Sequence, residues 1–382
     1  MTFISTLGDA LGPIVLAFTG AALVSLVLTP LVRRVVIRYE MVDRPEARRV
    51  NTSPIPRGGG IAVATAFIAI VLIFLAVNTE TLRLFSPLRA SQLAALLLGG
   101  ALAAAIGAVD DLLDLRARWQ LAGQLGLGLF AVLLGINIGF IANPFGNGLI
   151  RFEGPFAIAF TMFWIVGMIN SINFIDGLDG LSSGIAFIAA VTLGVISLTS
   201  DVNQPLIAIL CFILAGSLLG FLRWNLHPAS IFTGTSGVQF VGYTLALLAI
   251  LGTAKVAVAL LVLGVPIIDT FWIIVRRLSQ GRSPFTPDRG HIHHRMLDLG
   301  LSHRQTVFAI YGLCLVLALL AMALSGVTQL YAFLGVFLAS GLVLFIPTRG
   351  TFRRPEELEA TSYDDRPEAN DDDQTPEGRG PG

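Results

Sequence analysis

The sequence predicts an all-α membrane protein, a polytopic bundle of about eleven transmembrane helices. Of its 382 residues, 54% are hydrophobic and only 13% are charged, a composition too apolar for a water-soluble protein. The apolar residues gather in runs long enough to cross a bilayer core of about 30 Å, which takes roughly 20 helical residues. Basic residues collect in alternate loops between these runs, as they do in multi-spanning proteins.

Eleven apolar runs follow one another along the chain, and each predicts one span. The first is expected to be retained, because no basic residue precedes it whereas Arg33 and Arg34 follow it, unlike a secretory signal. Cys211 and Cys314 lie inside apolar runs, where a thiol is a small hydrophobic group, so no disulfide is expected. The runs comprise residues 13–32, 60–77, 91–109, 121–138, 156–172, 181–199, 205–222, 237–252, 256–275, 305–324 and 330–346.

The charges of the loops predict an orientation. Of the 25 basic residues, the even-numbered loops hold only Arg83, Arg89, Arg151 and Lys255. The positive-inside rule therefore predicts an N-terminus outside, with the odd-numbered loops and the C-terminus in the cytoplasm. The histidines also fall in odd-numbered loops: His227, His291, His293, His294 and His303. This shared bias predicts a working face on the cytoplasmic side.

The chain is predicted to have two parts, a transmembrane domain over residues 1–348 and a cytoplasmic tail over residues 349–382. The tail is acidic, rich in Pro and Gly, and without apolar anchors. Such a segment cannot offset the entropy cost of ordering, so we expect it to be disordered and non-catalytic.

Two adjacent carboxylates, Asp110 and Asp111, stand where the third run ends. A carboxylate near the membrane is costly, and an acid at a helix C-terminus also opposes the helix dipole. A metal ion or another cationic partner would offset both effects. The alternative is a helix end that simply meets water.

The fifth loop, NSINFIDGLDGLSSG, carries Asp176 and Asp179 three residues apart, so a helical turn would point both carboxylates the same way. No basic residue is near in sequence, and a shared divalent cation is the simplest compensation for two like charges. A water-exposed turn is the alternative. Gly177 and Gly180 would permit close backbone approach to a ligand.

The ninth loop contains DRGHIHHRML, in which Arg289 precedes His291, His293 and His294. No cysteine is nearby, and flanking arginines disfavour a second cation, so we favour phosphate or pyrophosphate binding over zinc. A plain surface loop is the remaining alternative.

The first loop ends with Arg57 and the glycines Gly58–Gly60, which open the second run. Backbone N–H groups of such a turn, together with a helix N-terminus, can bind an anion. The arginines of this loop can equally be determinants of topology, and both interpretations stay open.

Candidate metal-binding acids and anion-binding groups are therefore expected on one surface of an apolar bundle. This combination suits phosphoryl transfer, in which positioning and charge neutralisation supply most of the catalysis. A site at the membrane surface suits one lipid substrate and one soluble substrate.

Five motifs, DRPEARR…PIPRGGG, GAVDDLLDL, NSINFIDGLDG, NLHPASIFTG and DRGHIHHRML, stand in the order found in a known family. Over roughly residues 13–346 the chain resembles the polyprenyl-phosphate N-acetylhexosamine-1-phosphate transferases of bacterial cell envelopes. The resemblance implies a multi-pass enzyme of the inner (cytoplasmic) membrane that transfers an amino-sugar 1-phosphate from a UDP-sugar to undecaprenyl phosphate, releasing UMP. Mg²⁺, or Mn²⁺ in its place, is the implied cofactor. The HIHH form is similar to the branch that takes UDP-N-acetylglucosamine.

The same resemblance assigns roles to individual residues. The implied catalytic residues and metal ligands are Asp110, Asp111, Asp176 and Asp179. The implied substrate-binding residues are Asn173, Asn225, His291, His293, His294, Arg289 and Arg57.

Two positions depart from the family pattern. Thr235 stands where the family usually has the Asp of a GD-x-GS motif, and a neutral hydroxyl is a much poorer magnesium ligand than a carboxylate. Asn51 stands where many members have His. Either the metal site is rebuilt on the other four aspartates or catalysis is impaired.

The expected partners are UDP-N-acetylglucosamine or a related UDP-sugar, undecaprenyl phosphate and the lipid bilayer, with no nucleic acid. The sequence does not fix the sugar, the lipid length, the downstream polymer or whether the chain forms a homodimer. Two other functions stay open: a catalytically weak polyprenyl-phosphate-binding transporter or scaffold, which Thr235 supports, and an enzyme like the phospho-MurNAc-pentapeptide transferases.

Overall fold

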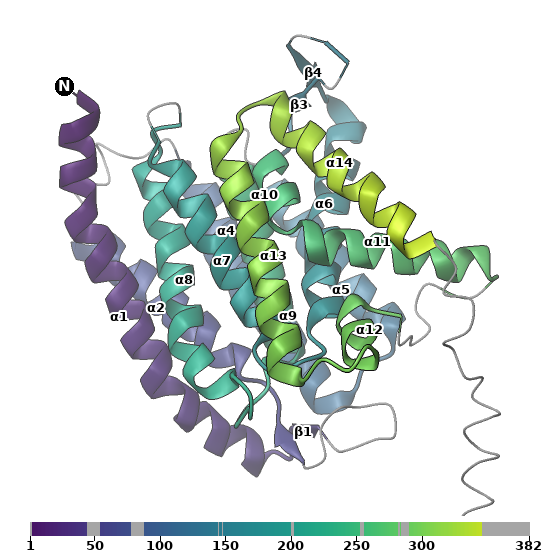
Figure 1. Cartoon of the computed structure of the whole chain (residues 1–382). Helices are drawn as coiled ribbons and strands as arrows, with labels where there is room; N and C mark the ends of the chain where they lie inside the picture. The colour runs from purple at the N-terminus through teal and green to yellow at the C-terminus, as the bar shows by residue number, and fades with distance from the viewer. Residues whose placement is uncertain are drawn as a thin grey trace, which may run out of the picture. The chain divides into compact units, whose positions relative to one another are not determined.

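The computed structural model describes residues 2–43, 54–77, 88–143, 145–146, 148–199, 202–252, 256–281, 283 and 290–345 (Figure 1). The regular secondary structure of these residues is helical apart from two short hairpins, and the predicted all-α class is confirmed. The chain divides into two compact units, Met1–Ser340 and Gly341–Gly382, and the bundle and its polar site belong to the first. The predicted tail lies outside the described residues.

Seven of the described helices are long and apolar enough to cross a membrane, which makes the chain a multi-pass membrane protein. They are α1 (Thr2–Arg38), α2 (Gly60–Val77), α4 (Ala90–Leu113), α6 (Gly154–Ile175), α8 (Pro205–Asn225), α9 (Gly234–Leu251) and α13 (His303–Ala323).

The remaining predicted runs also coincide with helices, but these are shorter or bent. The shorter ones are α5 (Ala117–Leu133), α7 (Leu181–Ser197) and α14 (Val327–Phe345), whose counted apolar part is Val327–Gly341. The ninth run is divided between α10 (Val256–Val262) and α11 (Gly264–Ser279), which are bent by 79°. The run predicted as one span over residues 256–275 is therefore a broken pair of helices. Pro266 explains the break, because it has no N–H to donate back to the carbonyl of Val262.

Two hairpins lie at opposite ends of the bundle (Figure 1). The strands β1 (Val42–Asp43) and β2 (Ile55–Pro56) pair antiparallel between α1 and α2. The strands β3 (Phe140–Ala142) and β4 (Leu149–Arg151) pair in the same way between α5 and α6. The end that carries β1 also carries the short helix α12 (Ile292–Asp298).

Small residues allow the most buried membrane helix, α8, to pack closely against α1. A Cβ added to Gly216 would lie 2.2 Å from the carbonyl oxygen of Phe18, and one added to Gly220 would lie 2.1 Å from that of Ala22. This GxxxG spacing brings backbones together, which is a main source of helix association where lipid tails are as apolar as the side chains.

The helices α4 and α9 are held together in a similar way. A Cβ at Gly107 of α4 would lie 2.4 Å from the Cα of Ser236 in the first turn of α9. Further along, the hydroxyl of Tyr243 donates to the carbonyl of Ala95 at 2.9 Å. This packing fixes the end of α4, with its two aspartates, against the start of α9.

Candidate functional site

A pocket of about 470 Å³ lies at the end of the bundle that carries β1. Its lining comes from β1 and the residues before α2, the end of α4, the α6–α7 turn, the α8–α9 loop, α12 and the start of α13. The polar lining residues are Asp43, Arg57, Asp111, Asn173, Asp176, Asp179, Asn225, His227, Thr233, Thr235, His294 and His303. The fold thus brings residues of all the odd-numbered loops between the predicted spans into one pocket.

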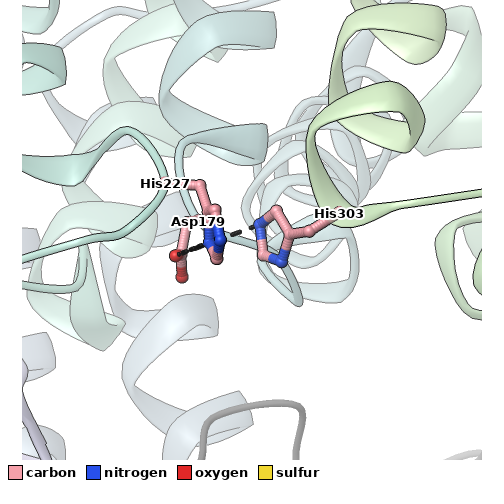
Figure 2. A group of neighbouring side chains, drawn as sticks. All are labelled: Asp179, His227 and His303. Carbon is pink, nitrogen blue, oxygen red and sulfur yellow. Dashed lines mark hydrogen bonds and ion pairs between the residues drawn. The ribbon is translucent and has the colours of Figure 1, made fainter.

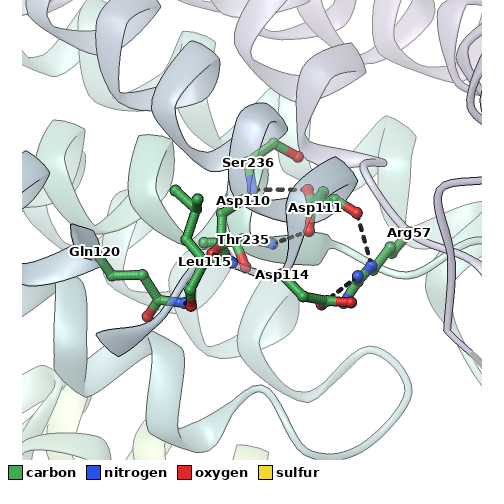
Figure 3. A network of polar contacts seen from close by, with 8 residues as sticks. All are labelled: Arg57, Asp110, Asp111, Asp114, Leu115, Gln120, Thr235 and Ser236. Carbon is green, nitrogen blue, oxygen red and sulfur yellow. Dashed lines mark hydrogen bonds and ion pairs between the residues drawn. The ribbon is translucent and has the colours of Figure 1, made fainter. Parts of the chain in front are cut away.

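Asp111, in the last turn of α4, caps the start of α9 (Figure 3). Its Oδ1 accepts the N–H of Thr235 at 2.7 Å, and its Oδ2 accepts the N–H of Ser236 at 3.0 Å. Gly234 permits this approach, since its φ is +70° and a Cβ there would lie 2.6 Å from the carboxylate. The positive end of the α9 dipole therefore stabilises this carboxylate, where the sequence suggested a metal or cation.

Asp110 lies outside the pocket lining and holds the turn between α4 and α5 (Figure 3). Its Oδ1 accepts the N–H of Leu115 at 3.0 Å and a hydrogen bond from Nε2 of Gln120 at 2.9 Å. The structure thus separates the two adjacent aspartates. One contacts the pocket, and the other supports the turn.

Arg57 places a cation beside Asp111 (Figure 3). Its Nε donates to the carbonyl of Asp111 at 3.0 Å, and its Nη2 lies 2.5 Å from Oδ1 of the exposed Asp114. Because the guanidinium also lines the pocket, it can contact an anionic group bound there.

The glycines that open α2 serve close packing. The N–H of Gly59 donates to the carbonyl of Phe232, and that of Gly60 to the carbonyl of Thr233, both at 2.9 Å. A Cβ at Gly60 would lie 1.9 Å from the Cα of Gly237. The anion-site interpretation of this turn is therefore wrong for these two N–H groups, because the α8–α9 loop packs against them.

Asp176 directly follows α6 and lies in the pocket, where the hydroxyl of Ser182 donates to its Oδ1. Burial raises the pKa of Asp176 from 3.8 to about 7. The negative charges of Asp111 and Asp179 act in the same direction, whereas hydrogen bonds with Ser182 and Thr233 oppose it. A carboxyl group that exchanges its proton near neutral pH is suited to act as a base.

Asp179 meets two histidines (Figure 2). Nδ1 of His227 lies 2.7 Å from Oδ2 of Asp179, and Nε2 of His303 lies 4.0 Å from the same oxygen. The two imidazole rings are stacked with their centroids 4.2 Å apart. Among the described residues, these three are the group of His, Cys, Asp and Glu side chains that could hold a metal ion, with one ligand atom each, all within 4.8 Å.

The two predicted asparagines have different surroundings. Asn173, in the last turn of α6, lines the pocket. Asn225 also borders it, but both ends of its buried amide bond to protein. Its Nδ2 donates to the carbonyl of Ile231 at 3.1 Å, and its Oδ1 accepts from the hydroxyl of Ser183 at 2.9 Å. Asn225 therefore shapes the α8–α9 loop.

The three histidines of the HIHH motif lie ring against ring, with centroids 5.5 Å apart for His291 and His293 and 4.4 Å apart for His293 and His294, but their surroundings differ. His291 is buried, with its Nδ1 2.8 Å from Oδ2 of Asp269. His293 is buried against Gly177, where a Cβ would lie 2.2 Å from its Nε2. Burial lowers the pKa of His293 to about 2, so this imidazole is neutral. Of the three, His294 lines the pocket. Two predicted positions, Arg289 and Asn51, lie outside the described residues.

Sequence reasoning did not assign site roles to His227 and His303, which the fold brings to Asp179. The available signal was their position in odd-numbered loops, and for His227 also its place within the NLHPASIFTG motif. The contact between them depends on how α8 and α13 pack, which no local pattern encodes.

The four aspartates do not form a shared metal site in this arrangement. Asp110 is bonded to the α4–α5 turn, and both oxygens of Asp111 accept N–H groups of α9. Asp176 accepts a hydrogen bond from Ser182. A magnesium ion bound by all four carboxylates does not fit these contacts.

The fold and the pocket define a multi-pass membrane protein with an acidic, histidine-rich site at one end of its helix bundle. Residues 93–253 match the model of glycosyl transferase family 4. The chain is 36% identical over 340 residues to a probable undecaprenyl-phosphate N-acetylglucosaminyl 1-phosphate transferase of Bacillus subtilis, covering 87% of this chain and 90% of that protein.

Two further relatives carry related names. A decaprenyl-phosphate N-acetylglucosaminephosphotransferase of Mycolicibacterium smegmatis is 34% identical over 317 residues, covering 76% of this chain and 77% of that protein. An undecaprenyl-phosphate alpha-N-acetylglucosaminyl 1-phosphate transferase of Salmonella typhi is 29% identical over 313 residues, covering 79% and 80%. The chain belongs to the polyprenyl-phosphate N-acetylhexosamine-1-phosphate transferases, and the resemblance seen in the sequence motifs is confirmed.

Proposed function

We propose that this enzyme transfers N-acetylglucosamine 1-phosphate from UDP-N-acetylglucosamine to undecaprenyl phosphate, with release of UMP, as the first membrane step of a cell-envelope glycan. Family membership supports the reaction class and the lipid acceptor. The observation that carries the proposal is the pocket itself. It combines carboxylates, an arginine and imidazoles at the end of an apolar bundle, which suits a lipid phosphate and a soluble nucleotide sugar.

In the proposed step, an oxygen of the lipid phosphate attacks the β-phosphorus of the UDP-sugar. A new P–O bond forms, and the bond between the β-phosphorus and the oxygen bridging to the α-phosphate breaks, so UMP leaves with that electron pair. Asp176 accepts the remaining proton of the lipid phosphate, because its pKa of about 7 is close to the second pKa of a phosphate monoester, about 6. Arg57 steadies the phosphate charge.

The proposed topology has eleven spans, an N-terminus outside and a cytoplasmic C-terminus, in the inner (cytoplasmic) membrane. The distribution of Lys and Arg supports this orientation, and the pocket is built from the loops that the positive-inside rule assigns to the cytoplasm.

UMP release tests the function. Purified full-length protein in lipid nanodiscs, given UDP-N-acetylglucosamine, undecaprenyl phosphate and either Mg²⁺ or Mn²⁺, should release UMP only when the lipid phosphate is present. Asp111→Asn removes the charge that faces the α9 N-terminus and should lower the rate on the order of 10²-fold.

The matched control is Asp298→Asn, an exposed carboxylate on α12 outside the pocket lining, which should keep the wild-type rate. Absence of UMP release with every UDP-sugar of a panel, while the protein still binds undecaprenyl phosphate, would favour the scaffold or transporter alternative. Release only with UDP-MurNAc-pentapeptide would favour the muramyl branch.

A further inference from the structure

The group formed by Asp179, His227 and His303 combines one carboxylate and two imidazoles at the wall of the pocket (Figure 2). Each residue offers one ligand atom, and these atoms lie within 4.8 Å of one another. Metal–nitrogen and metal–oxygen bonds of about 2.0–2.2 Å place neighbouring ligand atoms roughly 3–3.5 Å apart. The distances to Oδ2 of Asp179, 2.7 Å from Nδ1 of His227 and 4.0 Å from Nε2 of His303, lie on either side of that range.

The three side chains are held by elements far apart in the sequence. Asp179 lies in the turn between α6 and α7, and its Oδ2 also accepts the N–H of Ala229 at 3.1 Å. His227 lies in the α8–α9 loop, and its carbonyl accepts a hydrogen bond from Arg304 at 3.2 Å. His303 is the first residue of α13. The arrangement is therefore fixed by the fold before any ligand binds, as a metal site requires.

One atom of the group lacks a protein partner. Nε2 of His303 is buried and makes no hydrogen bond within the described part of the chain. It lies 4.0 Å from the nearest carboxylate oxygen of Asp179, which is too far for a hydrogen bond and leaves a gap of the size that an ion spans. A buried imidazole nitrogen without a partner is costly, and a metal ion would satisfy it.

The ligand chemistry selects the kind of ion. Magnesium favours oxygen ligands, whereas imidazole suits transition-metal ions, and sites with two histidines and one carboxylate bind such ions with further positions open. We propose that Asp179, His227 and His303 form a divalent-metal site that takes a transition-metal ion such as Mn²⁺ or Zn²⁺ in preference to Mg²⁺. Its role in neutralising the pyrophosphate of the donor rests on the function proposed above, but the binding itself does not.

Metal binding is measured on the full-length protein in nanodiscs, after chelation and without substrates. Titration with Mn²⁺, followed by the electron paramagnetic resonance of the free ion, should show a site that Zn²⁺ displaces and that equimolar Mg²⁺ does not. The spectrum of the bound ion should show coupling to imidazole ¹⁴N. Asp179→Asn, His227→Gln and His303→Gln should each weaken Mn²⁺ binding about tenfold or more.

The matched control is His294→Gln, a histidine of the same pocket outside the group, which should leave Mn²⁺ affinity unchanged. Thermal unfolding of each variant without metal separates loss of the site from loss of the fold. Unchanged affinity in all three variants, or absence of ¹⁴N coupling, would overturn the inference and leave a hydrogen-bonded Asp–His pair. Failure of UMP release with intact Mn²⁺ binding would instead count against the proposed function alone.

Discussion

The raised pKa of Asp176 gives a paired prediction for activity and stability. In the proposed mechanism the carboxylate accepts a proton, so activity needs its ionised form. With a pKa of about 7, roughly 90% of the groups are ionised at pH 8 and roughly 10% at pH 6. We therefore expect kcat/KM to fall about tenfold from pH 8 to pH 6 through this group alone.

The raised pKa of Asp176 affects stability in the opposite direction, because it lowers the stability of the fold as pH rises while activity increases. The folded state binds this proton more tightly than the unfolded state, so the stabilisation by protonation is complete below the unfolded pKa of about 3.8 and is lost progressively as pH rises to the folded pKa of about 7. A pKa change from 3.8 to about 7 corresponds to about 4 kcal/mol at most, less for the part of the side chain open to the pocket. Asp176→Asn cannot ionise, and we expect it to be more stable than the wild type at pH 8, by a smaller margin at pH 5, and by none below about pH 3.8.

UMP release, measured from pH 5 to pH 9, checks the prediction for activity. Thermal unfolding over the same pH range checks the prediction for stability. The pH–rate profile of the residual activity of Asp176→Asn should lack the inflection near pH 7. It should keep the inflection near pH 6 that comes from ionisation of the lipid phosphate. Asp298→Asn should follow the wild type throughout. The reasoning is refuted if Asp176→Asn keeps the wild-type pH profile, or if its unfolding temperature relative to the wild type is the same at pH 5 and pH 8.

Two further variants probe the packing around the pocket. Gly177→Ala would place a Cβ 2.2 Å from Nε2 of His293, so the α6–α7 turn must shift, and UMP release should fall on the order of 10²-fold. Gly126→Ala, where a Cβ meets nothing within 4 Å, should leave the rate unchanged, and equal rates for both would contradict this account. Thr235→Asp would add a second carboxylate beside Asp111, and we expect slower UMP release because like charges disfavour each other. A large gain would show instead that the native site is impaired.

The bundle could be predicted from the sequence because apolar runs and loop charges are local patterns. Each of the eleven predicted runs overlaps a helix or the α10–α11 pair. The bend within the ninth run was missed because hydrophobicity alone does not register a missing backbone donor. Gly264 and Pro266, next to the bend, are the local signal that identifies it.

The side-chain contacts of the candidate site could not be predicted from the sequence. They depend on the direction in which each side chain points, which the spacing of residues along the chain does not determine. Adjacent residues on a helix point about 100° apart, which is why Asp110 and Asp111 face a turn and a pocket respectively. Asp176 and Asp179 were expected on one helical turn, but α6 ends at Ile175 and α7 begins at Leu181. In the turn between them, Asp176 bonds to Ser182 and Asp179 faces the histidines.

Thr235 stands where the family usually has a carboxylate, and two histidines lie near Asp179. Both features bear on which metal ion the pocket prefers. Both oxygens of Asp111 are already bonded to N–H groups of α9, and Arg57 lies beside this residue, so the Asp111 carboxylate is a poor ligand for a cation. The Asp179 side offers one carboxylate and two imidazole nitrogens. A site of that composition changes which ion is preferred, and not only how tightly an ion is held. We therefore expect UMP release to be fast with Mn²⁺ and slow with Mg²⁺. Faster release with Mg²⁺ would indicate that the catalytic metal is bound by oxygen ligands alone.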